Sequence, residues 1–182
     1  MFVPLNILDE KSNVLRQKSK EVELPLSKED KKIIDHIIKH LTYSQIEKYS
    51  EKYDLRPGMG LAFPQLGFLK RIIVIVHEYE EGKFNNYCIV NPKIISHSEE
   101  KVALETGEGC LSVNREVEGH VPRYARIRIT GYDQDGNKIS IRAREDLAVA
   151  FQHEVDHLDG ILFYDRINKN KPFYNENETR LI

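Results

Sequence analysis

The first half of the chain contains one segment with a clear helical pattern of apolar and polar residues. Five apolar side chains recur three or four positions apart and therefore share one face: Ile33, Ile34, Ile37, Ile38 and Leu41. Ser27 is a suitable N-cap, and Glu29 and Asp30 place acidic groups in the first turn. The pattern predicts a helix over residues 27–49, followed by a polar loop over 49–57.

The middle of the chain is rich in β-branched residues and predicts two antiparallel hairpins. The run "RIIVIVHEY" (71–79) is typical of a buried strand, and "YCIVNPKII" (87–95) would return beside it after the turn "EEGKFN". Residues 126–144 alternate between apolar and polar side chains around Asp135-Gly136, a dipeptide favoured in hairpin turns.

The segment 145–160 predicts a second helix, with acidic residues at its start and Gly160 at its end. After it, "ILFYDRI" (161–167) predicts a last short strand. Strands dominate and pair in hairpins, which indicates an α+β fold rather than a parallel α/β fold. We expect these strands to pack around the helix of the C-terminal half, with the N-terminal helix in addition. The length of 182 residues predicts one domain over 1–182.

Composition and charge narrow the classes of protein. The formal net charge is −2, which argues against a large nucleic-acid-binding surface, so no direct nucleic-acid partner is expected. No apolar run approaches the length of a membrane span, and no membrane partner is expected. The first residues lack the pattern of a secretory signal. Cytoplasmic localisation is the default expectation, with both cysteines reduced.

The helix predicted over 145–160 carries His153-Glu154-x-x-His157. Residues four apart on a helix have Cβ atoms about 5–6 Å apart, so two imidazoles can bind one cation from the same side. Glu154 can then reach a water molecule on that cation. His36 and His40 have the same spacing, but they share a face with lysines and no carboxylate follows His36. We expect that pair to be solvated.

A catalytic metal site needs three protein ligands and an open position. Cys110 is the candidate third ligand, because it lies in the glycine-containing loop "ETGEGCLSV", where a thiolate can reach a distant helix. Cys88 lies within a β-branched strand and is expected to be a small core residue. His77, His97 and His120 have no partner pattern and are expected at the surface.

Three separated motifs together resemble peptide deformylase. They are Gly58-Met59-Gly60-Leu61-Ala62-Phe63-Pro64-Gln65, Glu108-Gly109-Cys110-Leu111-Ser112, and Gln152-His153-Glu154-Val155-Asp156-His157-Leu158. The resemblance extends over most of the chain, and the long segment before the first motif is similar to the form common in Gram-positive bacteria and mycoplasmas. One position departs from the family pattern. Phe63 stands where the family usually has alanine, which affects the expected packing beside Gln65.

The resemblance implies a metal-dependent hydrolase that removes the formyl group from N-formyl-methionyl peptides. Cys110, His153 and His157 would bind the metal, and Glu154 would be the general base. The Gln65 side chain and the Leu111 backbone N–H would stabilise the oxyanion. The remaining residues are implied in substrate binding: Gly58, Met59, Gly60, Glu108, Gly109, Val149 and Ala150. The glycines would let the substrate add as a strand. Met59, Val149 and Ala150 would line the methionine pocket, with Glu108 at its edge.

The ligand chemistry alone suits zinc, whereas the resemblance implies Fe²⁺, with Ni²⁺, Co²⁺ or Zn²⁺ as alternatives. The implied partners are N-formyl-methionyl peptides and nascent chains emerging from the ribosome. Asp156, between the two histidines, has Arg123 as a candidate ion-pair partner.

Two other functions share part of this pattern. A zincin-type metallopeptidase would use His153, Glu154 and His157, with its third ligand downstream, where only carboxylates are available. A structural zinc module would need a fourth protein ligand, which Cys88 or His120 would have to supply.

Overall fold

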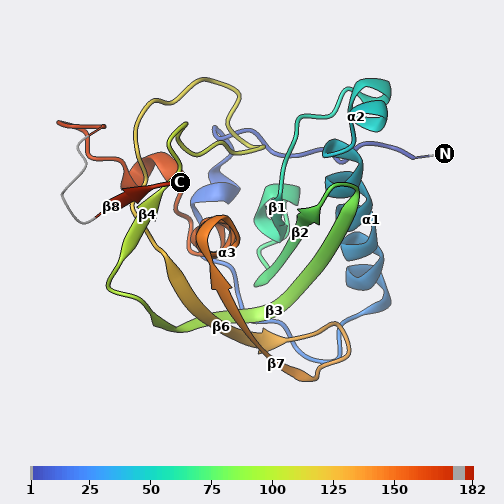
Figure 1. The fold of residues 1–182 in the computed structure, drawn as a ribbon. Helices are drawn as coiled ribbons and strands as arrows, with labels where there is room; N and C mark the ends of the chain where they lie inside the picture. Colours follow the sequence, from blue (N-terminus) through green and yellow to red (C-terminus); the bar gives the residue numbers. More distant parts are fainter. Residues whose placement is uncertain (1, 174–178) are drawn as a thin grey trace.

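A five-stranded antiparallel sheet forms the centre of the computed structural model, which describes residues 2–173 and 179–182 (Figure 1). The strand order is β1-β2-β3-β6-β7. The bounds of these strands are β1 Gly60–Ala62, β2 Ile72–Glu80, β3 Lys83–His97, β6 Arg126–Tyr132 and β7 Lys138–Arg144. Both predicted hairpins, β2–β3 and β6–β7, are confirmed, although β3 extends beyond the predicted strand at each end. The α+β class is confirmed as well.

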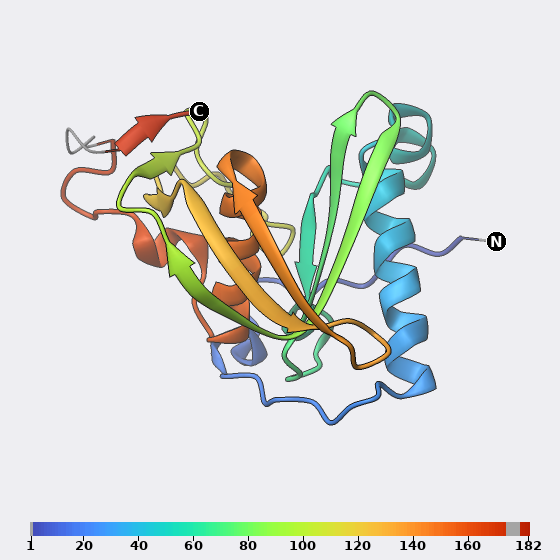
Figure 2. The same ribbon diagram turned by 60° about the horizontal axis from the view of Figure 1, so that its bottom comes forward.

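The first five residues of β2, Ile72–Val76, are buried on both faces, because helices pack on opposite sides of the sheet (Figure 2). On one side, Ile72, Val74 and Val76 share a core with apolar residues of α1 (Lys28–Ser44). On the other side, Ile73 and Ile75 share a second core with residues of α3 (Glu145–Leu158). The unbroken apolar run at the start of β2 follows from this double coverage.

The N-terminal helix is shorter than predicted, and a second helix, α2 (Glu47–Tyr53), occupies part of the expected loop. Ser27 caps α1 as predicted, since its hydroxyl accepts a hydrogen bond from Asp30 N. The helix ends at Ser44 because the next side chain, Gln45, donates hydrogen bonds to the carbonyls of Gly58 and Val76. The C-terminal end of α1 is thus fixed by contacts with residues distant in sequence.

Two further details differ from the expectations. The segment predicted as a last strand contains a 3₁₀ helix, η3 (Phe163–Arg166), since the Asp165 carboxylate accepts a hydrogen bond from Leu162 N and closes the turn. Two more 3₁₀ helices are η1 (Asn13–Arg16) and η2 (Phe63–Leu66). A small second sheet has the order β5-β4-β8, with bounds β4 Lys101–Ala103, β5 Arg123–Tyr124 and β8 Thr179–Leu181.

The prediction that His36 and His40 are solvated is wrong for His40. The N-terminal segment crosses that face of α1, so His40 is buried and its Nδ1 accepts a hydrogen bond from Leu5 N at 3.1 Å. His36 is half-buried, and its Nε2 lies 2.6 Å from Val3 O. Burial, followed by the charge of His36, lowers the pKa of His40 to about 4. Both rings hold the N-terminal segment in place.

Three other expectations concern Cys88, the remaining histidines and the absence of a membrane span. Cys88 packs against the α1 core, and burial raises the pKa of its thiol to about 12. His97 is exposed, whereas His77 and His120 are half-buried. Of the helices in the described part of the chain, none has the length and apolarity that crossing a membrane would require.

Candidate metal centre and active site

The predicted metal ligands come from two parts of the chain that the fold brings together. His153 and His157 lie one turn apart on α3, and Cys110 lies on the cysteine loop, which we define as residues 104–122. One ligand atom from each of the three residues lies within 4.8 Å of the other two. The Cys110 sulfur is 3.2 Å from His157 Nε2. Burial lowers the pKa of His157 and so favours the neutral imidazole, the form that binds metals.

A buried carboxylate orients the first histidine. His153 Nδ1 lies 2.8 Å from a Glu108 oxygen, which leaves Nε2 of His153 for a metal. Arg123 in turn donates two hydrogen bonds to Glu108, at 2.7 and 2.9 Å. Burial alone would raise the pKa of Glu108, but the hydrogen bonds from Arg123 and His153 lower it to about 2. Glu108 was predicted at the edge of the methionine pocket. It does line the cavity described below, but its carboxylate is occupied by Arg123 and His153.

The expected ion pair between Asp156 and Arg123 is confirmed, at 2.5 Å. Arg123 is only 3% exposed and bridges the two acidic residues Glu108 and Asp156. Arg166 also binds Asp156, from η3. A buried charge of this kind is stable only when its partners are all present. The network therefore ties α3 to the cysteine loop and to the start of β5.

Glu154 is buried next to the ligand cluster, with 4% of its surface exposed. Burial raises the pKa of its carboxyl to about 7, against the opposing charge of His153. Its Oε2 atom accepts no hydrogen bond from any described residue, although buried carboxylate oxygens normally have partners. The side chain fits because residue 60 is glycine: a Cβ atom at Gly60 would lie 2.4 Å from Glu154 Oε1.

Two groups predicted to stabilise an oxyanion lie beside Cys110. Gln65 Oε1 accepts a hydrogen bond from Ala62 N, so its amide nitrogen must face the other way. That nitrogen is 3.1 Å from Ser112 Oγ and 3.6 Å from the Cys110 sulfur. Within the described residues, the backbone N–H of Leu111 has no hydrogen-bond acceptor. Phe63 does not disturb this arrangement, because its side chain is buried in the α1 core.

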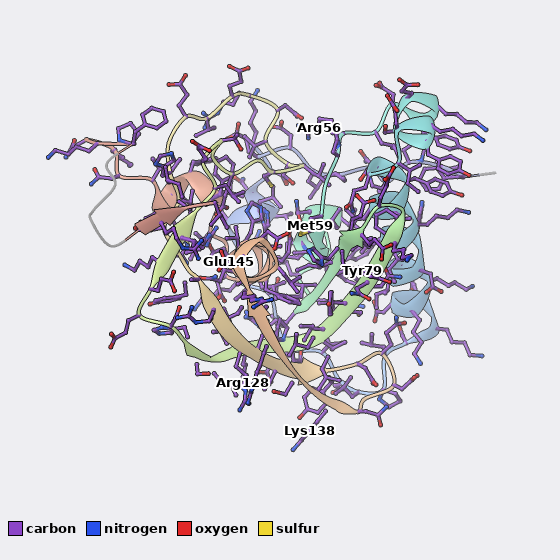
Figure 3. All side chains as sticks on the ribbon, in the orientation of Figure 1. Arg56, Met59, Tyr79, Arg128, Lys138 and Glu145 are labelled. Atoms are coloured by element: carbon purple, nitrogen blue, oxygen red, sulfur yellow. The ribbon has the colours of Figure 1, made fainter. Side chains whose placement is uncertain are left out.

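A cavity of ≈530 Å³ opens beside these groups. Its lining includes every predicted site residue except His157, and the predicted substrate-binding residues all belong to it. Sequence reasoning missed five lining residues: Arg56, Pro57, Leu104, Val113 and Asp146. Figure 3 shows Met59 beside α3, and Arg56 nearer α2 on the segment that leads from α2 into β1. Arg56 donates hydrogen bonds to the carbonyls of Leu111 and Val113 and thereby holds the cysteine loop.

The residues present fit a divalent metal. A thiolate and two imidazoles are suitable donors, and three protein ligands leave a position open for chemistry. The carboxylate on the far nitrogen of His153 is the usual partner of a metal-binding histidine. No fourth protein ligand belongs to the cluster in the described part of the chain, as a closed structural zinc site would require. An α+β fold with an open three-ligand site beside a buried carboxylate defines the class of metal-dependent hydrolases.

The comparisons with known proteins agree with this class. A family model for polypeptide deformylase matches residues 4–173. The chain is 50% identical over 162 residues to a peptide deformylase of Shouchella clausii, covering 89% of this chain and 88% of that protein. It is 46% identical over 173 residues to peptide deformylase 2 of Bacillus subtilis, covering 95% and 94%.

A solved structure of similar fold is the peptide deformylase of Ehrlichia chaffeensis, with a TM-score of 0.75 and 34% identity. That alignment covers 93% of this chain and 90% of the solved one. The chain belongs to the peptide deformylase family, whose members are metal-dependent hydrolases. The resemblance to the Gram-positive form is confirmed by the Shouchella and Bacillus relatives.

Proposed function

We propose that this chain hydrolyses the formamide bond of N-formyl-methionyl peptides and releases formate and a peptide with a free amino terminus. The observation that carries the proposal is the convergence of Cys110, His153 and His157 beside the buried carboxylate of Glu154, at the wall of a cavity. Membership of the peptide deformylase family supplies the substrate class.

In this proposal Cys110, His153 and His157 bind one divalent metal, with Fe²⁺ as the native ion and Ni²⁺, Co²⁺ or Zn²⁺ as substitutes. When bound, such a metal supplies Lewis acidity, which lowers the pKa of an adjacent water molecule and stabilises negative charge on a carbonyl oxygen. The Glu108 carboxylate holds the ring of His153 in the orientation that presents Nε2 to the metal.

Glu154 is the proposed general base and acid. It accepts a proton from the water that attacks the formyl carbon. When the C–N bond breaks, it donates that proton to the leaving amine nitrogen. The unpartnered Oε2 atom and the position of Glu154 in the cavity wall support this role, because the carboxylate keeps an acceptor that no described residue occupies.

The proposed oxyanion donors are the Gln65 side-chain amide and the Leu111 backbone N–H. The hydrogen bond from Ala62 N to Gln65 Oε1 supports the assignment, since it fixes which end of the amide can donate. The unpaired N–H of Leu111 supports it as well. Loss of one such donor typically costs about 2.7–4 kcal/mol of transition-state stabilisation.

The substrate backbone would bind along β1, whose second edge pairs with no strand in the described part of the chain. Gly58, Met59 and Gly60 border the cavity along this edge, and Gly109 lies in the lining of the same cavity. Main-chain hydrogen bonds to a free strand edge bind a peptide without regard to its sequence. Met59, Val149 and Ala150 supply apolar surface for the methionine side chain, with Leu104 as an additional neighbour.

We further propose that the substrates are nascent chains at the ribosome, that the enzyme acts in the cytoplasm, and that residues 1–182 form one domain. The zincin alternative gains no support from the geometry. Within the described residues, the ligand cluster includes Cys110 and none of the downstream carboxylates.

The decisive experiment is a formate-release assay with formyl-Met-Ala-Ser, after anaerobic reconstitution with Fe²⁺ or Ni²⁺. We expect turnover with the reconstituted chain and neither metal nor turnover with Cys110→Ala. Cys88→Ala is the matched control and should retain both. A metallopeptidase would keep its metal after Cys110→Ala and would cut internal peptide bonds. Retention of the metal by Cys110→Ala, or cleavage of internal peptide bonds by the unmodified chain, would overturn the proposal.

A further inference from the structure

The outward face of the β6–β7 hairpin carries four arginines in two directly opposed pairs. Arg126 faces Arg144, and Arg128 faces Arg142, in the antiparallel register. The residues between the two pairs, Ile127 and its cross-strand partner Ala143, point to the opposite face of the sheet, toward α3. We call Arg126, Arg128, Arg142 and Arg144 the arginine face.

This arrangement opposes folding. Like charges directly opposite on an antiparallel pair are destabilising, and the register places two such pairs in succession. Arg126 is compensated by Glu100 at 2.8 Å. Arg128, Arg142 and Arg144 form no ion pair with any carboxylate in the described residues. The alternating pattern of the two strands requires polar side chains on the outward face, but any polar residue would satisfy it. The fold therefore does not explain why all four outward positions are arginine.

The arginine face lies on the side of the sheet opposite to α3, where Arg126, Arg142 and Arg144 are exposed and Arg128 is half-buried. Ile127, Ile129 and Ala143 pack toward α3, whereas α1 covers the sheet only at β2 and β3 (Figure 2). Arg128 projects from β6 away from α3 (Figure 3). Between the arginine face and the end of β3 lies an open groove of ≈1030 Å³.

We propose that the arginine face binds the phosphodiester backbone of RNA. Arginine matches phosphate with two parallel hydrogen bonds, and a row of arginines along a groove can follow successive phosphates of one strand. A net charge of −2 would argue against nucleic-acid binding if the charged side chains were spread evenly over the surface. They are not, because four arginines are gathered on this one hairpin face. Two carboxylates also line the groove. Glu100 already binds Arg126 and Arg180, and Glu99 forms no ion pair within the described residues, so three unpaired arginines remain against one free carboxylate.

Other anionic partners fit less well. A membrane surface would need apolar side chains to insert, and a protein partner would need an apolar centre for its interface. The only exposed large apolar side chain near the groove, among those the structure describes, is Ile95 of β3, at 56% exposure. RNA needs neither feature, because phosphate contacts supply most of its non-specific affinity.

Binding of RNA on this face would leave the substrate cavity accessible. The cavity is lined from β1, α3 and the cysteine loop, on the α3 side of the sheet. A chain held by its arginine face on an RNA-containing particle could therefore still receive a peptide. The proposal does not depend on the proposed hydrolase function, since RNA binding is measured separately from turnover.

The test measures fluorescence anisotropy of a labelled single-stranded RNA of about 20 nucleotides, titrated with the metal-loaded chain between 50 and 200 mM KCl. We expect binding that weakens with salt. Arg128→Gln/Arg142→Gln should bind at least roughly tenfold more weakly at 50 mM salt. Its log–log salt dependence should be shallower by about 1.4, since each single-strand phosphate contact contributes about 0.7.

The matched control is Lys48→Gln/Lys52→Gln, which removes the same charge from exposed positions on α2. It should bind RNA like the unmodified chain, and both double variants should release formate at the unmodified rate. The arginine variant should also unfold at the same or a higher temperature, because repulsion is relieved. The proposal is overturned if RNA does not bind, if both double variants weaken binding equally, or if phosphatidylglycerol vesicles bind in preference to RNA.

Discussion

At the scale of single residues, Gly60 determines whether the Glu154 carboxylate can occupy its position. A Cβ atom there would lie 2.4 Å from Glu154 Oε1, closer than non-bonded atoms approach. Gly60→Ala should therefore displace the carboxylate without removing a metal ligand. We expect kcat to fall by roughly 100-fold, the effect of about 1 Å of misplacement in an active site, with the bound metal retained. Formate-release kinetics and metal analysis measure the two effects.

Gly109→Ala is the control for this substitution. A Cβ atom at Gly109 would meet nothing within 4 Å, although the residue lines the same cavity and adjoins Cys110. This variant should retain most of its kcat. An equal loss of kcat in the two variants would mean that any added side chain in the cavity lining lowers kcat. The contact between residue 60 and Glu154 would then not be the cause.

His40 makes stability depend on pH. Its pKa is lowered to about 4 in the folded chain, mainly by burial, and is about 6.5 when unfolded. Between about pH 6.5 and pH 4, His40 is protonated in the unfolded chain but remains neutral in the folded chain. The contribution of His40 is therefore fully present above pH 6.5 and is lost as pH falls toward 4. The loss reaches about 3 kcal/mol, since one pKa unit corresponds to about 1.4 kcal/mol.

His40→Asn tests this prediction, because asparagine can still accept a hydrogen bond from Leu5 N but does not titrate. Urea unfolding of both chains should be measured between pH 7 and pH 4. The unfolding free energy of the unmodified chain should fall more steeply, and the two curves should converge toward pH 4. Parallel curves would show that His40 does not contribute to the acid sensitivity. Titration of the metal ligands affects both chains and cancels in the difference.

At the scale of elements, Arg56 joins the segment before β1 to the cysteine loop. It donates hydrogen bonds to the carbonyls on either side of Ser112, those of Leu111 and Val113. Arg56→Ala should loosen the loop that carries the Leu111 N–H, and we expect kcat to fall by roughly 10- to 100-fold. Steady-state kinetics should show a larger change in kcat than in KM, because the loop positions groups that act in the transition state.

Arg115→Ala is the matched control on the same loop. Arg115 pairs with Glu10 at the surface, and exposed ion pairs contribute only about 0–1 kcal/mol. Its kcat should stay close to that of the unmodified chain. If both arginine variants lost kcat equally, the effect would come from general loosening of the loop rather than from the two carbonyl contacts of Arg56.

The elements that the sequence predicted well are those whose pattern is local. The β-branched run of β2 and the Asp135-Gly136 turn contain their own signals, and both hairpins formed as expected. The end of α1 had no local signal, because Gln45 finds its acceptors on Gly58 and Val76, far along the chain. Strands β4, β5 and β8 are two or three residues long, too short for any period to be visible.

The same distinction applies to the candidate site. His153, Glu154 and His157 could be predicted because their spacing on one helix is a local pattern, and the glycine-containing loop around Cys110 pointed to the proposed third ligand, which the fold does bring to the two histidines. The contacts of Arg56 and Glu108 could not be predicted from the sequence. A lone arginine before a proline carries no signal, and the hydrogen bond of Glu108 to His153 joins elements 45 residues apart. Such contacts exist only once the chain is folded.

At the scale of the whole molecule, the proposed metal site joins the cysteine loop to α3. The loop has no helix or strand until β5, so its position depends on Arg56, on the Arg123 network and on the metal ligands. A ligand that binds only the folded chain stabilises it by about 2.7 kcal/mol at 100 times its dissociation constant, and by about 4.1 kcal/mol at 1,000 times. Metal removal should therefore lower the melting temperature.

For a chain of this length, 1 kcal/mol corresponds to about 2–4 °C, so chelation should lower Tm by roughly 5–15 °C. Differential scanning calorimetry before and after chelation, under anaerobic conditions, measures the shift. Cys110→Ala should melt near the chelated temperature and should not respond to the chelator, whereas Cys88→Ala should keep the full shift. If chelation shifts Cys110→Ala as much as the unmodified chain, the stabilising metal is bound somewhere else. If it shifts neither, the folded chain binds metal no more tightly than the unfolded chain does, and the proposed site at Cys110 does not hold a metal.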